Sequence, residues 1–477
     1  MSNNIVKVMC LGLVTMLIIV IFGIFITTNV SADYTSGTRN GMEVALNISF
    51  SSQSIIISNA KYNGPVSSMV KANNGDYLAF IREGTSHMGI GDYGVLKLYR
   101  STNNGVTFTY NSTLLSVSNK DVRNPSSGIT PTGRIFVFAW VYDCDNPANA
   151  TSPSSGPLEY LYSDNNGVTW SGVQILTTGI VDGFNGTNIS NSYGKLIILG
   201  NNRIGMSYFA FNDSSINQYQ VRFLYSDNDG LIWSCVNITD VFTYPPRLLS
   251  ETDIVYIGNN QIVAITRVDT SAYVWMYTSI DNGLTWNDRG QMPPMFSGIC
   301  RGPSLSIVKD NGGGIWVLAL YVYNNYFYDI AYGQDLIDNG IDAWDSPEQY
   351  APGAIVTGYG VAGTCIMNQE TGVAKFLTNE YVSGVGTAYV SIQTITVTIT
   401  LSFDQLHQGT TISLYNSFFI VLLVLGAIVS IGVMIIRYAE VTKGRTLEET
   451  IYILVIMIVA IFIVAIFLAG MAGVLRI

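Results

Sequence analysis

The longest hydrophobic stretches lie near the two ends of the chain. Residues 8–26, 418–436 and 451–475 are runs of about 19 or more residues almost free of charge, the length that crosses ~30 Å of hydrocarbon as a helix. Lys7 precedes the first run and Val30-Ser31-Ala32 follows it, so that run is either a cleaved secretory signal or a retained anchor. The pattern predicts one N-terminal and two C-terminal transmembrane helices.

Lysine and arginine flank these runs unevenly. Arg437, Lys443 and Arg445 lie between the last two runs, and no Lys or Arg occurs between Phe376 and Ile436. Positive residues stay on the cytoplasmic side of a membrane. We therefore expect a membrane protein whose long middle segment lies on the extracellular side.

That middle segment has short apolar stretches separated by turns rich in glycine and asparagine. Stretches of β-branched and aromatic residues at 77–81, 135–141, 263–266 and 315–320 are typical of strands. Residues 42–57 are expected to form an outer strand beside 388–401, which would protect the edges of the last sheet. The middle segment is therefore predicted to be all-β.

A short phrase recurs along these predicted strands. It consists of a serine, an aspartate or asparagine, a glycine and an aromatic residue, and its four clear copies are 101–108, 163–170, 226–233 and 279–286, with a weaker fifth at 338–344. The asparagine or aspartate can cap backbone amides, the glycine supplies a positive φ, and the aromatic residue packs into its own sheet. The phrase is a hairpin turn that carries no catalytic group.

A second repeat, at 64–70, 123–129 and 301–307 with weaker copies near Ser190, Ser250 and Gly358, marks six strand starts at intervals of roughly 50–65 residues, which suits radial blades. The predicted fold class is all-β, a six-bladed β-propeller ectodomain plus one N-terminal and two C-terminal transmembrane α-helices. The predicted domains are a signal peptide or anchor at 1–32, the propeller at 33–405, a linker at 406–417, a helix at 418–436, a cytoplasmic loop at 437–450 and a helix at 451–475.

The charge and the residue composition argue against some classes of partner and cofactor. The 477 residues carry a net charge of −10, which argues against a basic nucleic-acid-binding face, so we expect no nucleic-acid partner. We expect no metal or other cofactor either, because His87 and His407 do not form a metal-binding motif and the glycines at 312–314 suit a hairpin turn. Cys144, Cys235, Cys300 and Cys365 form an even set that allows three disulfide pairings.

Polar residues that suit a sugar acid stand at equivalent strand ends of different predicted blades. Inner strands of a propeller meet around its axis, so such residues converge although they are far apart in the sequence. Each arginine among them also has a structural reading, in which it only hydrogen-bonds strand ends. The residues at strand starts are Arg123, Glu251, Arg301 and Tyr359, and those at strand ends are Arg82 and Arg267.

The recurring phrase resembles the Asp box of sialidases and related propellers. The resemblance implies a catalytic set in which Asp92 is the acid/base, Glu251 the glutamate and Tyr359 the nucleophile. In that family a glutamate deprotonates the tyrosine that attacks the anomeric carbon, and arginines bind the substrate carboxylate. The predicted substrate-binding residues are Arg267, Arg82, Arg301 and Arg123.

The chain departs from the family pattern at two places. It has Asn63 in Tyr62-Asn63-Gly64-Pro65, where the family has the first arginine of its carboxylate-binding triad. No arginine lies near 326–331, where the third is expected. Three functions stay open: a sialidase-type glycosidase acting on acidic sugars of surface glycans or glycoproteins, a non-catalytic glycan- or protein-binding surface protein, and a structural cap whose C-terminal helix pair binds membrane proteins.

Overall fold

The computed structural model divides the chain into two compact units, 1–33 with 46–400 and 34–45 with 401–477. In the second unit, β1 (Gly37–Arg39) pairs antiparallel with the beginning of β2 (Met42–Phe50). The structure describes residues 37–39, 42–50, 54–59, 62–63, 67–85, 91–144, 158–176, 188–212, 215–239, 242–243, 248–269, 273–292, 301–323, 325–344, 348–350, 357–358, 366–382 and 387–403.

The first unit consists of antiparallel sheets that follow one another along the chain, and each sheet is one blade. Blade 1 contains β4 (Tyr62–Asn63), β5 (Ser68–Lys71), β6 (Tyr77–Gly84), β7 (Val95–Ser101) and β8 (Thr109–Leu115). Blade 2 contains β9 (Lys120–Ile129), β10 (Ile135–Asp143), β11 (Glu159–Ser163) and β12 (Gln174–Ile175). Blade 3 contains β13 (Asn188–Ser192), β14 (Ile197–Ile198), η2 (Gly200–Asn202), β15 (Ile204–Asn212), β16 (Ser215–Ser226), β17 (Ser234–Asn237) and β18 (Phe242–Thr243).

The remaining sheets complete the set of six. Blade 4 contains β19 (Leu249–Gly258), β20 (Gln261–Val268), β21 (Val274–Ser279) and β22 (Asn287–Gln291). Blade 5 contains β23 (Arg301–Lys309), β24 (Ile315–Tyr323), β25 (Asn325–Tyr332) and β26 (Glu348–Tyr350), with α2 (Gly333–Asp338) and η3 (Gly340–Ala343) after β25. Blade 6 contains β27 (Thr357–Gly358), β28 (Ile366–Asn368), β29 (Val373–Val382) and β30 (Thr387–Phe403), and β3 (Ser54–Asn59) pairs with β30.

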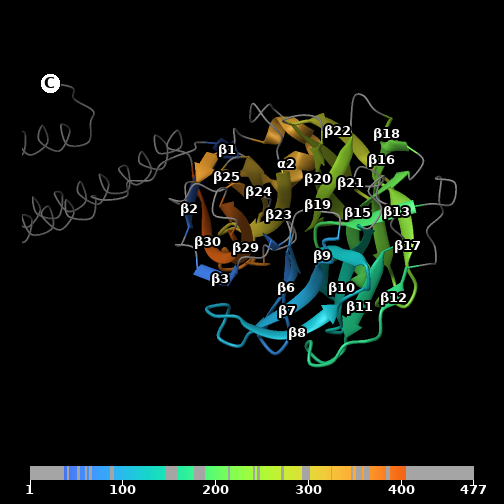
Figure 1. Ribbon diagram of the computed structural model, residues 1–477. Coiled ribbons are helices and arrows are strands. Elements are labelled where there is room, and N and C mark those ends of the chain that lie inside the picture. The colour runs from blue at the N-terminus through green and yellow to red at the C-terminus, as the bar shows by residue number, and fades with distance from the viewer. Residues whose placement is uncertain are drawn as a thin grey trace, which may run out of the picture. The chain divides into compact units, whose positions relative to one another are not determined.

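The inner strands of the blades contact one another in a closed cycle. β5 contacts β9, β9 contacts both β13 and β14, β14 contacts β19, β19 contacts β23, β23 contacts β28, and β28 contacts β5. Figure 1 shows the sheets arranged around a common axis in this order. The first unit is thus a six-bladed propeller, a form in which radial repetition leaves only short, protected sheet edges.

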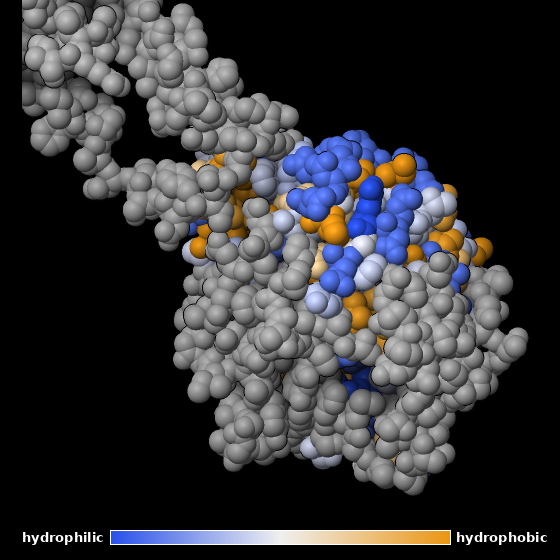
Figure 2. Space-filling model, turned by 90° about the horizontal axis from the view of Figure 1, so that it is seen from above, coloured by the Kyte–Doolittle hydropathy of each residue, from blue (hydrophilic) through white to orange (hydrophobic). Residues whose placement is uncertain are grey.

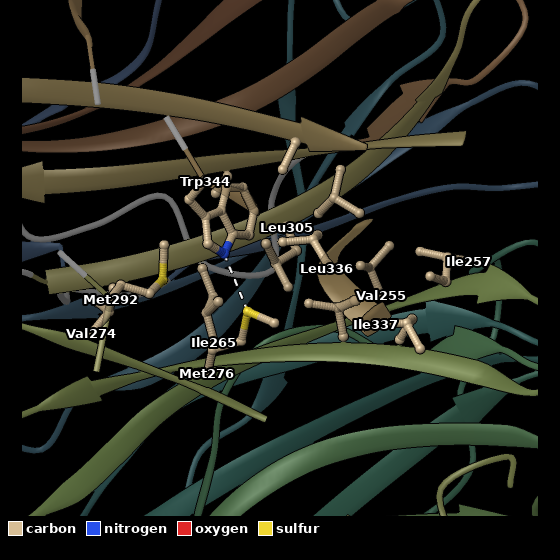
Figure 3. Packing of buried hydrophobic residues seen from close by; sticks show 14 of the residues in the cluster. Val255, Ile257, Ile265, Val274, Met276, Met292, Leu305, Leu336, Ile337 and Trp344 are labelled. Atoms are coloured by element: carbon tan, nitrogen blue, oxygen red, sulfur yellow. Dashed lines mark hydrogen bonds between the residues drawn. The ribbon is translucent and has the colours of Figure 1, made fainter. Parts of the chain in front are cut away.

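Hydrophobic side chains from facing sheets fill the space between neighbouring blades. Between blades 4 and 5, Ile265 and Met276 pack with Leu305, Leu336 and Trp344 (Figure 3). The Trp344 indole N–H donates to the Met276 sulfur at 3.2 Å. Burial of such aliphatic and aromatic side chains stabilises by roughly 1.5–3 kcal/mol for each one fully removed from water.

The four clear copies of the phrase form the same hydrogen-bonded turn between the third and fourth strands of blades 1–4. In the second copy, the Ser163 hydroxyl accepts the Gly167 N–H at 2.9 Å, and the Asn165 side-chain oxygen accepts the Thr169 N–H at 2.9 Å. Asn166 and Gly167 both have positive φ, 57° and 73°, which explains the asparagine and glycine at these positions. Asparagine therefore serves as the acceptor as well as aspartate does in the fourth copy, where Asp281 accepts the Thr285 N–H at 2.8 Å.

The weaker fifth copy does not form this turn. Residues 338–344 lie at the end of α2 and in η3. Only Gly340, with φ +65°, and the buried Trp344 keep the features of the phrase. Leu336 stands where the other copies have serine, and the Asp338 carboxylate accepts from the Gln334 side chain at 3.1 Å within the helix.

Arginines join the turns of neighbouring blades. Arg100 of blade 1 donates to the carbonyl oxygens of Asn166 and Gly167 in blade 2, at 2.9 and 2.8 Å. Arg203 of blade 3 donates in the same way to the Asn282 carbonyl of blade 4 at 3.0 Å. These arginines tie each turn to the blade before it and have a structural role.

The side of the protein seen in Figure 2 mixes hydrophilic and hydrophobic residues over the described surface. Several of the large exposed hydrophobic residues belong to the phrase turns. Leu231 and Ile232 are in the third copy and Leu284 is in the fourth. Single exposed hydrophobic residues of this kind are ordinary on a protein surface.

The predicted fold class is corrected in its helical part. Within the described residues, which lie between 37 and 403, no helix is long and apolar enough to cross a membrane. The longest, α2, has 6 residues and is only about 9 Å long, against the ~30 Å that a spanning helix must cover. The three hydrophobic runs at 8–26, 418–436 and 451–475 fall outside the described residues, as do Cys300 and Cys365.

Candidate functional site

Four of the residues predicted for the site, Arg82, Arg123, Glu251 and Arg267, lie at the same end of the propeller. Inner strands of a propeller run in the same direction along the axis, and Arg123 and Glu251 lie near the starts of β9 and β19. Antiparallel pairing brings the end of each second strand to the same level. Arg82 and Arg267 lie near the ends of β6 and β20, the second strands of blades 1 and 4.

One group of these residues, the Arg82 cluster, consists of Arg82, Asp92, Asp121 and Arg123. The Arg82 guanidinium donates to both oxygens of Asp121, at 2.7 and 2.8 Å, and to Asp92 at 2.6 Å. Arg123 donates to the same Asp121 carboxylate at 3.2 Å. All four side chains are at most 3% exposed. Two cations and two anions therefore neutralise one another inside the protein, between blades 1 and 2.

Asp92 is held from two sides. Its second oxygen accepts the backbone N–H of Thr85 at 2.5 Å and the Thr85 hydroxyl at 2.9 Å. Burial by itself raises the pKa of Asp92, but the charge of Arg82 and the Thr85 N–H outweigh burial and hold that pKa below its usual range. In this arrangement Asp92 is an ionised partner of Arg82.

The second group, the Glu251 cluster, consists of Glu251, Arg267 and Asp269, together with the backbone N–H of Gly302. Arg267 donates to one oxygen of Glu251 at 2.7 Å, and its Nε lies 3.0 Å from Asp269. The other oxygen of Glu251 accepts the Gly302 N–H of blade 5 at 3.0 Å. The Ser250 hydroxyl donates to Asp269 at 2.6 Å. The cluster therefore joins blades 4 and 5.

The Glu251 cluster is partly exposed to solvent. The side chains of Glu251, Arg267 and Asp269 are 15%, 19% and 23% exposed. Burial lowers the pKa of Arg267, but the charges of Glu251 and Asp269 outweigh burial and raise that pKa above its usual value. The site thus keeps a permanent cation and two carboxylates within reach of a ligand.

Of the two remaining predicted site residues, Arg301 and Tyr359, the structure gives only the backbone position of Arg301. Arg301 begins β23 next to Gly302, which gives its backbone position at the Glu251 cluster. Tyr359 lies outside the described residues. The structure therefore brings Arg82, Arg123 and Asp92 together, and Glu251 together with Arg267, while the roles predicted for all these residues stay predictions.

Sequence reasoning missed two carboxylates. Asp121 lies two residues before Arg123 and Asp269 two residues after Arg267, and each contacts that arginine. Side chains two residues apart on a strand point to the same face. An arginine with an aspartate at this spacing near a strand end was therefore a signal available in the sequence.

The chemistry of the site is that of anion binding and proton transfer. Guanidinium groups bind carboxylates with two parallel hydrogen bonds, and an ionised glutamate is a proton acceptor. In the part of the chain that the structure describes, no group of three or more His, Cys, Asp or Glu side chains could hold a metal ion.

Comparison with known sequences gives two sialidases and no family model that matches. The chain is 28% identical over 238 residues to a sialidase of Clostridium perfringens, covering 46% of this chain and 60% of the relative. It is 28% identical over 201 residues to a sialidase of Paraclostridium sordellii, covering 39% of this chain and 48% of the relative. The chain thus spans about half to three fifths of the length of these curated relatives.

Solved structures show the same architecture. A protein of unknown function from Dyadobacter fermentans superposes with a TM-score of 0.57 at 15% identity, covering 73% of this chain and 99% of that one. The leech intramolecular trans-sialidase gives 0.52 at 15% identity over 70% of this chain and 68% of its own. NanB sialidase from Streptococcus pneumoniae gives 0.53 at 12% identity over 73% and 70%. The fold is sialidase-like.

Proposed function

We propose that the propeller is a glycoside hydrolase of sialidase type that removes acidic sugars from surface glycans or glycoproteins. The observation that carries the proposal is the Glu251 cluster, in which a glutamate and an arginine bond to each other at the open end of the ring. The likeness to the clostridial sialidases supports the same activity. The proposal concerns the propeller alone.

Arg267 is proposed to bind the carboxylate of the sugar. Its guanidinium is held on two edges by Glu251 and Asp269, which fixes its orientation before a ligand arrives. A pre-oriented guanidinium loses less conformational entropy on binding than a mobile one. Arg301, one residue before the N–H that binds Glu251, is proposed as a second contact to the substrate.

Glu251 is proposed as the base of the reaction. In this scheme its carboxylate takes the phenolic proton of Tyr359 while the tyrosine oxygen attacks the anomeric carbon. The bond to the leaving oxygen breaks, and that oxygen takes up a proton from an acid. Water then attacks the anomeric carbon and gives its proton to the conjugate base of that acid, while the bond to the tyrosine oxygen breaks and Glu251 returns its proton to the phenol.

A second candidate function is binding of acidic sugars without hydrolysis. It is favoured by the burial of the Arg82 cluster, because Asp92, predicted as the acid, is ion-paired to Arg82 at 2.6 Å and 3% exposed. A carboxylate with a lowered pKa is a poor proton donor near neutral pH. Loss of the acid would leave a site that can bind a sugar acid and cannot cleave its glycoside.

The test is hydrolysis of a fluorogenic sialoside by the full chain and by Glu251→Gln. The matched control is Glu370→Gln, which changes a 71% exposed side chain after β28, at the opposite ends of the inner strands. We expect turnover by the wild type and the control, and a loss of about a hundredfold or more in Glu251→Gln.

Binding of free sialic acid to the same proteins separates the two candidates. Binding without turnover, abolished by Arg267→Leu, would contradict the hydrolase and support the binding protein. Absence of both turnover and binding from a folded chain would contradict both functions.

A further inference from the structure

The inner strands of blades 2, 4 and 5 each contain a β-bulge near the end of the propeller that carries the candidate site. The bulges coincide with the second sequence repeat, at its copies 123–129 and 301–307 and at its weaker copy near Ser250. At each bulge two residues of the inner strand oppose one residue of the second strand. They are 124–125 opposite Ala139, 250–251 opposite Arg267, and 302–303 opposite Tyr321.

The residues of the repeat explain the bulges of blades 2 and 5. The first bulge residue is Asn124, with φ 44°, or Gly302, with φ 59°, and glycine and asparagine are the residues that adopt positive φ most readily. The second is Pro125 or Pro303, which has no N–H to donate to the sheet and is tolerated at a bulge. The repeat therefore encodes a bulge in the inner strand.

The bulge of blade 5 directs a backbone N–H to the Glu251 cluster. A bulged residue leaves the regular hydrogen-bond ladder of the sheet, and the N–H of Gly302 donates to Glu251 of blade 4 at 3.0 Å. The other oxygen of Glu251 accepts from Arg267 at 2.7 Å. The two carboxylate oxygens are thus held from two different blades.

Glu251 itself lies in the bulge of blade 4, opposite Arg267. The residues on either side of it are anchored, because Ser250 donates to Asp269 at 2.6 Å and the Thr252 hydroxyl bonds to that of Thr266 at 2.6 Å. Ser250 and Thr252 are 2% and 0% exposed, whereas the Glu251 side chain is 15% exposed. Bulges next to active sites commonly re-aim a side chain in this way.

We propose that Gly302 is a positioning residue for Glu251. Its positive φ aims the N–H at the carboxylate, and this bond, together with that of Arg267, fixes the orientation in which Glu251 takes up a proton. A base must lie within hydrogen-bond reach of the proton that it accepts, and small displacements lower the rate by large factors. The inference rests on the proposed function, in which Glu251 is the base of the hydrolase.

The test compares Gly302→Ala with Gly302→Asn in the full chain. Alanine disfavours positive φ, whereas asparagine tolerates it, as Asn124 does in the equivalent bulge of blade 2. With a fluorogenic sialoside, kcat should fall about tenfold or more in Gly302→Ala while KM changes less than about threefold, because Glu251 acts in the chemical step. Gly302→Asn should keep kcat within about threefold of the wild type.

The matched control is Gly340→Ala. Gly340 also lies in blade 5 and has φ +65°, and a Cβ there would meet Arg289 at 3.5 Å or more, an ordinary contact. This variant introduces the same kind of backbone strain away from Glu251 and should keep the kcat of the wild type. An equal loss of kcat in both alanine variants, an equal loss in Gly302→Asn, or full kcat in Gly302→Ala would overturn the inference. Turnover by the wild type would leave the proposed function standing in each of these cases.

Urea denaturation judges the inference separately if the wild type shows no turnover. A bond between Gly302 and Glu251 predicts that Gly302→Ala and Glu251→Ala are not additive, with a coupling of about tenfold in the equilibrium constant of unfolding. Gly340→Ala and Glu251→Ala should be additive. Additivity of the first pair would overturn the inference, whereas coupling in an inactive protein would contradict the proposed function alone.

Discussion

The Arg82 and Glu251 clusters are built from the same parts and differ in their access to water. Each has an arginine near a strand end that is ion-paired with two carboxylates, Arg82 with Asp121 and Asp92, and Arg267 with Glu251 and Asp269. The Arg82 cluster is at most 3% exposed, whereas the side chains of the Glu251 cluster are 15–23% exposed. Charges that are fully buried must be satisfied inside the protein, while charges near water can exchange a partner for a ligand. Exposure, more than residue type, is what distinguishes the two clusters.

The largest loss of stability is expected from Asp121→Ala. It removes the carboxylate that both Arg82 and Arg123 contact, and an uncompensated buried charge costs about 3–5 kcal/mol. Urea denaturation of the wild type and the variant measures this loss in the free energy of unfolding. The control Asp164→Ala breaks the ion pair of Arg134 with a 58% exposed aspartate, and such pairs contribute about 0–1 kcal/mol. Equal losses in both variants would remove the distinction between the clusters.

Asp92→Asn should lower stability by about 2 kcal/mol at pH 7, since charge-assisted hydrogen bonds are lost. The folded-state pKa of Asp92 lies below its usual range, so its ionised form stabilises the fold above an unfolded value near pH 4, and this stabilisation is lost as the pH falls through the folded pKa. The wild type and the variant should therefore converge in stability below about pH 4. Denaturation at several pH values measures this, with the exposed Asp227→Asn as control. A constant difference down to low pH would contradict it.

Arg267→Leu should act mainly on the ligand. Water can reach Glu251 and Asp269, so the expected loss of stability is only about 1–2 kcal/mol. Affinity for free sialic acid should fall about a hundredfold. Calorimetric titration measures the affinity, and urea denaturation of the same sample measures the free energy of unfolding. A stability loss as large as that of Asp121→Ala, with affinity unchanged, would place Arg267 among the structural arginines.

The smallest effect is expected from the turn phrase. Asn165→Ala removes the acceptor of the Thr169 N–H and should cost about 1 kcal/mol. Asn165→Asp keeps an acceptor and should be nearly neutral. Thermal unfolding of the two variants measures the difference, and equal losses would show that the side-chain oxygen is not what the turn requires.

The sequence predicted those parts of the fold that depend on neighbours along the chain. The phrase could be recognised because its bonds join residues four apart, such as Asn165 and Thr169. The strands predicted to begin at Tyr77, Ile135 and Ile315 begin there in the structure. The three transmembrane helices are the part of the predicted fold class that is corrected.

The site was harder to predict because its bonds cross between blades. Asp121 lies 39 residues from Arg82 and binds it from the next blade. Because this partner could not be recognised in the sequence, Arg82 was predicted as a possible substrate ligand. The choice between a structural arginine and a substrate ligand depends on burial, and burial follows from the packing of whole blades. A cavity lined by residues of all six blades could not be predicted for the same reason, since it exists only where the inner strands meet.

The pairing of β3 with β30 constrains when the propeller can close during synthesis. Ser54 lies opposite Ile392 and Asn59 opposite Ala388, so a strand that is synthesised early pairs with one that is synthesised more than 300 residues later. A growing chain on the ribosome carries β3 as an open edge until nearly the whole propeller has emerged. Such an edge can pair with a neighbouring chain instead. The strand that closes the ring is therefore also the one through which an unfinished molecule would aggregate.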